Sequence, residues 1–130
     1  MKALEIWQQV TGNYYELKLE DGSLVLEKTD FSRDLPAGLI TELKAHKPEI
    51  LDLLHFQEKA DTLLLESSRR IAQAWPSGFD LDIDRRWQQE EDDLRAAYFS
   101  ADMDRLRAVI ESREKLALRL FEAYRKQRAA

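Results

Sequence analysis

Four acidic residues between positions 80 and 91 have the spacing of a calcium-binding loop. Positions 1, 3, 5 and 12 of such a loop would be filled by Asp80, Asp82, Asp84 and Glu91. Position 6, where the sharp turn of the loop requires glycine, is Arg85. Leu81 and Ile83 alternate with the aspartates, and this alternation is typical of an extended segment. We therefore expect no calcium site, and we interpret Asp84 as the N-cap of the following helix.

The remaining polar residues form no catalytic or metal-binding pattern. His46 and His55 are nine residues apart across Pro48, which is not a metal-ligand spacing, and His46 suits a helix end. The acidic run 90–93 points to all sides of a helix, so its carboxylates cannot converge on an ion. No phosphate-binding glycine loop is present, and no serine adjoins a plausible base. We assign no catalytic, cofactor-binding or metal-binding residue, and we expect a protein that is not an enzyme.

Composition narrows the class of protein further. The 130 residues carry a net charge of −5, contain 35% charged residues and include no cysteine. A length of 130 residues fits one domain, or one small domain with an appendage. A chain without cysteine suits a reducing cytoplasm, and no apolar run approaches the ~20 residues of a membrane span. Nucleic-acid binding is not expected from an acidic chain, because neutralising phosphates requires an excess of basic side chains.

The N-terminal third predicts a short helix followed by a β-hairpin. Residues 2–10 have the periodicity of a helix that Gly12 ends. Asp21-Gly22 lies between two alternating runs and predicts a type I′ turn, because both residue types tolerate positive φ. The register that follows pairs Leu19 with Leu24 and Leu17 with Leu26, so four leucines share one face. This face must rest on other elements, and the apolar stripe of residues 35–54 is the expected partner.

Residues 29–34 predict a polar loop, in which Phe31 is the candidate to pack into the core. Residues 35–54 then predict two helices that meet at a corner. Pro36 suits the first turn of the first helix, and Pro48 interrupts the pattern and opens the second. The second helix is expected to continue to residue 74, with Ser67-Ser68 as its weakest point. Beyond the extended segment at 79–83, helices over 85–99 and about 103–127 predict a helical hairpin.

The most regular stretch also resembles a known family. Its residues are Leu35-Pro36, Leu39, Leu43 to Lys47, Glu49 to Leu51 and Leu53-Leu54. With the preceding helix and hairpin, they resemble the TubC-type N-terminal docking domain of nonribosomal peptide assembly lines. The resemblance covers residues 2–55 and implies an αββαα fold, frequent homodimers, and capture of a partner's C-terminal peptide beside the hairpin. Similar segments also occur in small proteins of bacterial mobile elements.

We therefore predict an α+β fold with a docking-domain-like αββαα module over residues 1–55 and an α-helical region over 56–130. The predicted function is that of a small, cytoplasmic protein–protein interaction or adaptor protein that forms a homodimer and does not enter membranes. The expected partner-binding residues are on the hairpin: Glu16, Lys18, Val25, Glu27 and Lys28. Because the hairpin is acidic on balance, its ligand is expected to be neutral or basic.

The alternative is a mobile-element-associated regulatory protein that contacts nucleic acid or a nucleic-acid-bound complex. Its candidate contacts are the basic clusters Arg69/Arg70, Arg85/Arg86 and Arg125, Lys126 and Arg128. The homodimer is expected for a separate reason: the apolar residues of 48–75 look too numerous for the remaining elements to cover.

Overall fold

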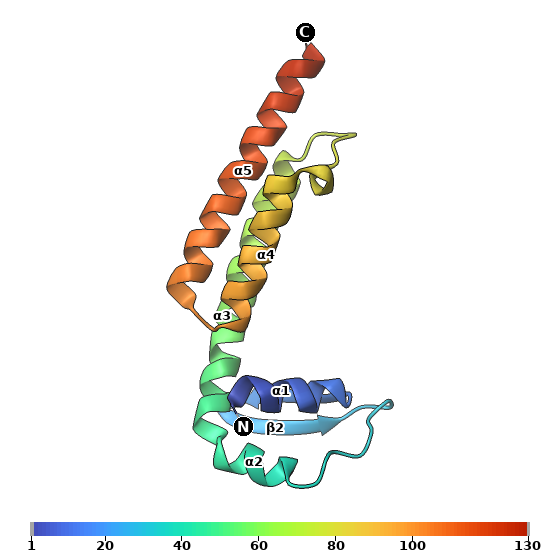
Figure 1. Ribbon diagram of the computed structural model, residues 1–130, viewed down its shortest axis with the longest axis vertical. Helices are drawn as coiled ribbons and strands as arrows, with labels where there is room; N and C mark the ends of the chain where they lie inside the picture. The colour runs from blue at the N-terminus through green and yellow to red at the C-terminus, as the bar shows by residue number, and fades with distance from the viewer. Residues whose placement is uncertain (1, 130) are drawn as a thin grey trace. The chain divides into compact units, whose positions relative to one another are not determined.

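The computed structural model describes residues 2–129 and confirms the predicted α+β class (Figure 1). The elements are α1 (Ala3–Gly12), β1 (Tyr15–Glu20), β2 (Ser23–Lys28), α2 (Leu39–Ala45), α3 (Lys47–Ala74), a 3-10 helix η1 (Leu81–Ile83), α4 (Arg85–Phe99) and α5 (Met103–Ala129). The chain divides into two compact units, of which the first ends at Gln57 and the second begins at Glu58, within α3. Each unit has its own hydrophobic cluster.

The β-hairpin has the predicted turn and register. Asp21 and Gly22 both have positive φ, 50° and 77°, as a type I′ turn requires. Leu19 pairs with Leu24 and Leu17 with Leu26, so the leucines share one face of the sheet. The strong twist of a type I′ turn matches that of the strands, which is why this short sequence fixes its own register.

The leucine face is packed into the core of the first unit. The buried members of this core come from the first helix, the first strand and the helices of 39–54: Ile6, Val10, Leu17, Leu39, Leu43, Ile50 and Leu54. Residues 35–54 were the expected support for the hairpin, and they contribute four of these seven side chains. The short helix α1 also takes part, since it packs against β1 and α2.

The first of the two helices in 35–54 begins later than predicted. Pro36 lies in a turn, with its carbonyl accepting a hydrogen bond from the Leu39 amide at 3.2 Å. Gly38 has a φ of 83°, which lies in the left-handed region, so the helical ladder cannot extend back to Pro36. The corner between the two helices agrees with the sequence: His46 caps the end of α2, and Pro48 lies in the first turn of α3.

The second unit consists of the later part of α3 with η1, α4 and α5, and side-chain hydrogen bonds join α3 to α5 and to α4 (Figure 1). Its buried cluster is Ile71, Leu81, Trp87, Leu116, Ala117 and Phe121. The helix α3 runs without a break through Ser67-Ser68 over 28 residues, as the sequence predicted for a helix to residue 74, and Ser67 is fully buried. The small Ser67 side chain lets α5 approach and bonds to one of its carboxylates.

The prediction of an extended segment at 79–83 is wrong. Residues 81–83 form one turn of 3-10 helix, which Asp80 starts by accepting a hydrogen bond from the Asp82 amide. A strand would place Leu81 and Ile83 on the same face, whereas Leu81 is fully buried and Ile83 is 78% exposed. Of the two apolar residues in this alternating pattern, Leu81 anchors the turn in the core and Ile83 projects into water.

This difference predicts unequal costs for two similar substitutions. Leu81→Ala should lower the free energy of unfolding by about 2–5 kcal/mol, because it leaves a cavity in the core. Ile83→Ala should change it by less than about 0.5 kcal/mol, because the Ile83 side chain is in water. Urea unfolding followed by circular dichroism measures both. Equal losses would mean that the segment is a strand with both side chains buried.

Candidate partner-binding site

The outer face of the hairpin carries a compact ion-pair cluster. Lys18 lies 3.0 Å from the Glu16 carboxylate and 2.5 Å from the carboxylate of Glu27, its diagonal neighbour on the other strand. Hydrogen bonds to Glu27 and then to Glu16 raise the pKa of Lys18 above its usual range. Val25 pairs with Lys18 in the register and is half-buried. These four predicted site residues therefore share one face.

Lys28 does not belong to this face. It pairs with Tyr15 at the open end of the hairpin, and alternation along β2 places it on the side of Leu26 rather than of Glu27. The predicted group of five thus becomes a face of four, Glu16, Lys18, Val25 and Glu27, with Lys28 exposed on the opposite rim.

The register also determines which backbone groups are available to a partner. In a two-residue hairpin the residues flanking the turn exchange both hydrogen bonds, and bonded and non-bonded pairs alternate from there. Lys18 and Val25 are therefore a bonded pair whose N–H and C=O groups face each other. The outward-directed backbone groups belong to the leucine positions, such as Leu24 and Leu26 on β2. Within the described residues the sheet has only these two strands.

A short ordered loop projects an aromatic side chain beside the open end of the hairpin. The Tyr14 carbonyl accepts hydrogen bonds from the Thr29 hydroxyl at 2.6 Å and the Ser32 hydroxyl at 2.8 Å. The Arg33 amide donates to the Asn13 carbonyl at 3.0 Å. Between these anchors Phe31 is 79% exposed, so the expectation that it plugs the core is wrong. The loop is held by its polar residues, which leaves the ring in water.

Tyr14, whose carbonyl anchors the loop, is itself an aromatic residue that is 48% exposed. Its φ of 64° is unusual for a residue other than glycine, and the two hydroxyls on its carbonyl hold it there. The Arg33 guanidinium lies 5.3 Å from the centre of the Tyr14 ring, within cation–π range. We call Tyr14 and Phe31 the aromatic pair. The sequence signal for an exposed Phe31 was the polar run around it. Hydroxyl side chains in such a run can bond to the nearby backbone and hold the loop without burying the ring.

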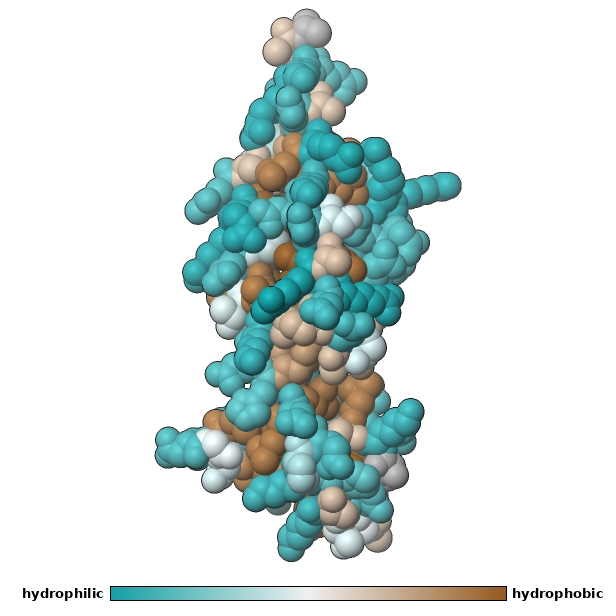
Figure 2. Space-filling model, turned by 90° about the vertical axis from the view of Figure 1, so that its left-hand side faces the viewer, coloured by the Kyte–Doolittle hydropathy of each residue, from teal (hydrophilic) through white to brown (hydrophobic). Residues whose placement is uncertain are grey.

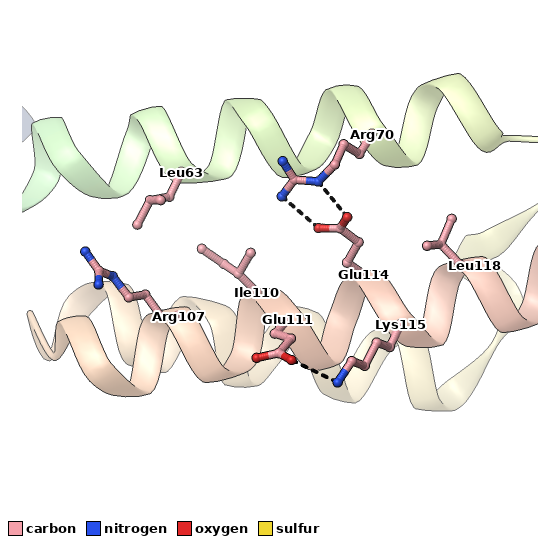
Figure 3. Close-up of a pocket in the computed structure, with 8 residues that line it drawn as sticks. All are labelled: Leu63, Arg70, Arg107, Ile110, Glu111, Glu114, Lys115 and Leu118. Atoms are coloured by element: carbon pink, nitrogen blue, oxygen red, sulfur yellow. Dashed lines mark hydrogen bonds and ion pairs between the residues drawn. The ribbon is translucent and has the colours of Figure 1, made fainter.

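The second unit has an open groove of about 320 Å³ between α3 and α5. Figure 3 shows Leu63 and Ile110 pointing toward each other across it, and the Arg70 guanidinium reaching the Glu114 carboxylate from α3. Both carboxylate oxygens of Glu114 accept from Arg70, at 2.6 and 3.0 Å, and one also accepts from the buried Ser67 hydroxyl. The Arg70 bond lowers the pKa of Glu114, and the Ser67 hydroxyl lowers it further.

Acidic side chains that suggested metal binding are engaged in helix capping and in helix–helix contacts. The Asp84 carboxylate accepts from the Arg86 amide at 2.9 Å and caps α4 as predicted, and its pKa is lowered chiefly by the Arg86 side chain. The run at 90–93 is not simply solvated, since Glu90 bonds to Ser112 and Glu91 to Arg113 on α5. Within residues 2–129 no group of three acidic or histidine side chains could hold a metal ion.

Several of the basic residues considered for nucleic-acid contact have partners inside the protein. Arg70 binds Glu114, Arg86 binds Asp84 and Lys126 binds Glu122. Arg125 donates to the Ala74 carbonyl at the end of α3. On the face drawn in Figure 2, hydrophilic side chains separate the hydrophobic ones into patches.

Among the described helices there is none with the length and apolar content needed to cross a membrane. Comparisons with protein-family models, with curated proteins and with solved structures return no match for this chain.

The Glu114 site predicts a specific pH dependence of stability. A carboxyl group whose pKa is lowered by folding stabilises the folded state above its unfolded pKa, 4.5, and this contribution is lost as the pH falls through the folded value. Glu114→Gln should therefore cost up to about 1 kcal/mol at pH 7, a modest value because Arg70 is half exposed. The cost should shrink below pH 4. Thermal unfolding from pH 3 to 7 measures it, with Glu122→Gln as the exposed control. A pH-independent cost would contradict this account.

Proposed function

We propose that this protein is a non-enzymatic interaction module that binds a partner protein through the aromatic pair and the outer face of the hairpin. The observation that carries the proposal is Phe31, a large ring held 79% exposed on a loop fixed by hydrogen bonds. Exposing such a ring is unfavourable in water, and aromatic side chains of this kind are the usual anchors of protein interfaces. Because the loop is already ordered, binding loses little conformational entropy.

The neighbouring hairpin supplies a second means of recognition. A partner segment in extended conformation can pair with the outward backbone groups at Leu24 and Leu26, while its side chains meet the hairpin surface. Residues 1–57 contain ten acidic and six basic side chains, so we expect the partner segment to be neutral or basic. The resemblance of residues 2–55 to docking domains implies the same use of the hairpin.

The internal pairing of Arg70, Arg86 and Lys126 supports a protein partner over a nucleic-acid partner. A basic side chain that already neutralises a carboxylate has less to offer a phosphate. We therefore favour the interaction module over the mobile-element regulator that contacts nucleic acid.

Peptide selection on the whole chain tests the proposal. We expect a random dodecapeptide library displayed on phage to yield extended, apolar and basic sequences. The corresponding synthetic peptides should lose at least about tenfold in affinity for Phe31→Ser, because an anchor side chain is removed. Ile40→Ser is the matched control, since Ile40 is an exposed apolar residue on α2, and it should bind like the wild type.

Amide hydrogen exchange then separates strand pairing from binding to the face alone. Strand pairing should newly protect the outward amides of Leu24 and Leu26, whereas the Val25 amide is already bonded within the hairpin. Binding without new protection at these leucines would reject the strand-pairing geometry. Peptides that shift the protein's backbone amide resonances in residues 85–127, as measured by NMR, would overturn the proposed site.

A further inference from the structure

The groove between α3 and α5 is a surface of the second unit that the proposed function does not use (Figure 3). Its apolar side chains lie at two ends. At one end Leu63 of α3 faces Ile110 of α5, and at the other end Leu118 of α5 is 40% exposed. The Arg70–Glu114 pair joins the two helices between these ends. The groove therefore offers two apolar positions separated by a polar bridge.

The separation of the two ends suits a ligand that is itself a helix. Ile110 and Leu118 are eight residues apart on α5, which corresponds to about 12 Å at 1.5 Å per residue. Residues seven or eight positions apart on a second helix share one face at this distance, so they can enter both ends of the groove. An extended peptide is less favoured, because both walls are helices whose backbone groups are bonded within each helix and offer none for strand pairing.

Basic side chains outnumber acidic ones in the lining of the groove, although the chain as a whole has a net charge of −5. Arg70 is paired with Glu114, and Lys115 is paired with Glu111. Arg107 lines the end that holds the two facing apolar side chains (Figure 3). Its side chain is exposed and has no ion pair or hydrogen bond in the described part of the chain. The charge of this lining that other described residues leave uncompensated is therefore positive.

We infer that this groove binds an acidic amphipathic helix of a partner protein. Apolar side chains seven or eight residues apart on that helix fill the two ends of the groove, and a carboxylate beside the first of them pairs with Arg107. A contact of this kind buries the exposed apolar atoms of Leu118 and compensates the charge of Arg107 at the same time.

The lining favours this occupant over two others. A nucleic acid would meet Arg107 with a phosphate, but its backbone has no apolar side chains to fill the two ends. A second copy packed groove to groove would bring another Arg107, and the acidic side chains of its groove, Glu111 and Glu114, are already paired. An acidic partner helix supplies both the apolar side chains and a free carboxylate.

The groove belongs wholly to the second unit, which begins at Glu58. The hairpin and the aromatic pair, proposed above to bind a neutral or basic segment, belong to the first unit. A protein with both surfaces joins two partners of opposite charge, which is the arrangement of an adaptor. Loss of one surface should leave binding at the other intact.

Selection of helical peptides on the full chain tests the inference. The probe is a displayed library of helices about 20 residues long, with leucine fixed at two positions seven apart and the flanking positions free. We expect the selected helices to carry Asp or Glu at the flanking positions. Their synthetic versions should bind at least about tenfold more weakly to Leu118→Asp, because a carboxylate then occupies an apolar end. Leu65→Asp is the matched control, since Leu65 is exposed on α3 and does not line the groove, and it should bind like the wild type.

A charge exchange tests the contact with Arg107. Arg107→Glu should weaken binding of the selected helices about tenfold, because it replaces an attraction with a repulsion. Arg119→Glu is the control, at an exposed arginine of α5 that does not line the groove. A helix whose contacting carboxylate is changed to lysine should recover binding to Arg107→Glu, and this recovery shows that the variant is folded. Phe31→Ser, in the first unit, should bind like the wild type.

Selection of basic helices, or of none, would overturn the inference. Affinities that Arg107→Glu leaves unchanged would also overturn it. Self-association of the wild type that Leu118→Asp abolishes would assign the groove to a second copy instead, and displacement of the selected helices by duplex DNA would assign it to nucleic acid.

Discussion

The length of α3 is the constraint on which the rest of the structure depends. A helix of 28 residues extends about 42 Å at 1.5 Å per residue, which is more than one small core can cover. The chain meets this constraint with two separate clusters. Ile50 and Leu54 of α3 belong to the cluster that also contains the hairpin and α1, and Ile71 belongs to the cluster formed with α4 and α5. Each unit buries a different part of the same helix.

Polar contacts then fix how the helices of the second unit align. The buried Ser67 hydroxyl and the Arg70 guanidinium converge on Glu114, which joins α3 to α5. Arg113 joins α5 to α4, because it stacks 4.3 Å from the centre of the Trp87 ring and bonds to Glu91. Hydrophobic packing tolerates small sliding of one helix along another, whereas a bidentate Arg–carboxylate pair is directional. These pairs therefore select one alignment for the three helices.

Two large apolar side chains are exposed in short segments between the long elements. Phe31 projects from the loop after β2, and Ile83 projects from the 3-10 turn before α4. In each case local hydrogen bonds hold the backbone: hydroxyls on the Tyr14 carbonyl in one, the Asp80 carboxylate on the Asp82 amide in the other. Such bonds keep a segment ordered without burying its apolar side chain, so the segment can be rigid and exposed together. That combination lowers the entropy lost on binding.

The sequence alone determined the features whose causes are local. The type I′ turn at Asp21-Gly22, the hairpin register, the Asp84 cap and the span of α4 all follow from residue type and spacing. The sequence did not determine which apolar residue of a short segment is buried, because the answer depends on what packs against it. Leu81 fills a space beside Trp87 and Phe121, whereas Ile83, two residues later, has no such space. Ser67 likewise reads as a weak point in isolation, and it becomes a close contact only because Glu114 of α5 lies opposite. Burial is a property of the assembled helices, so only the tertiary structure could place Phe31 and Ile83 on the surface.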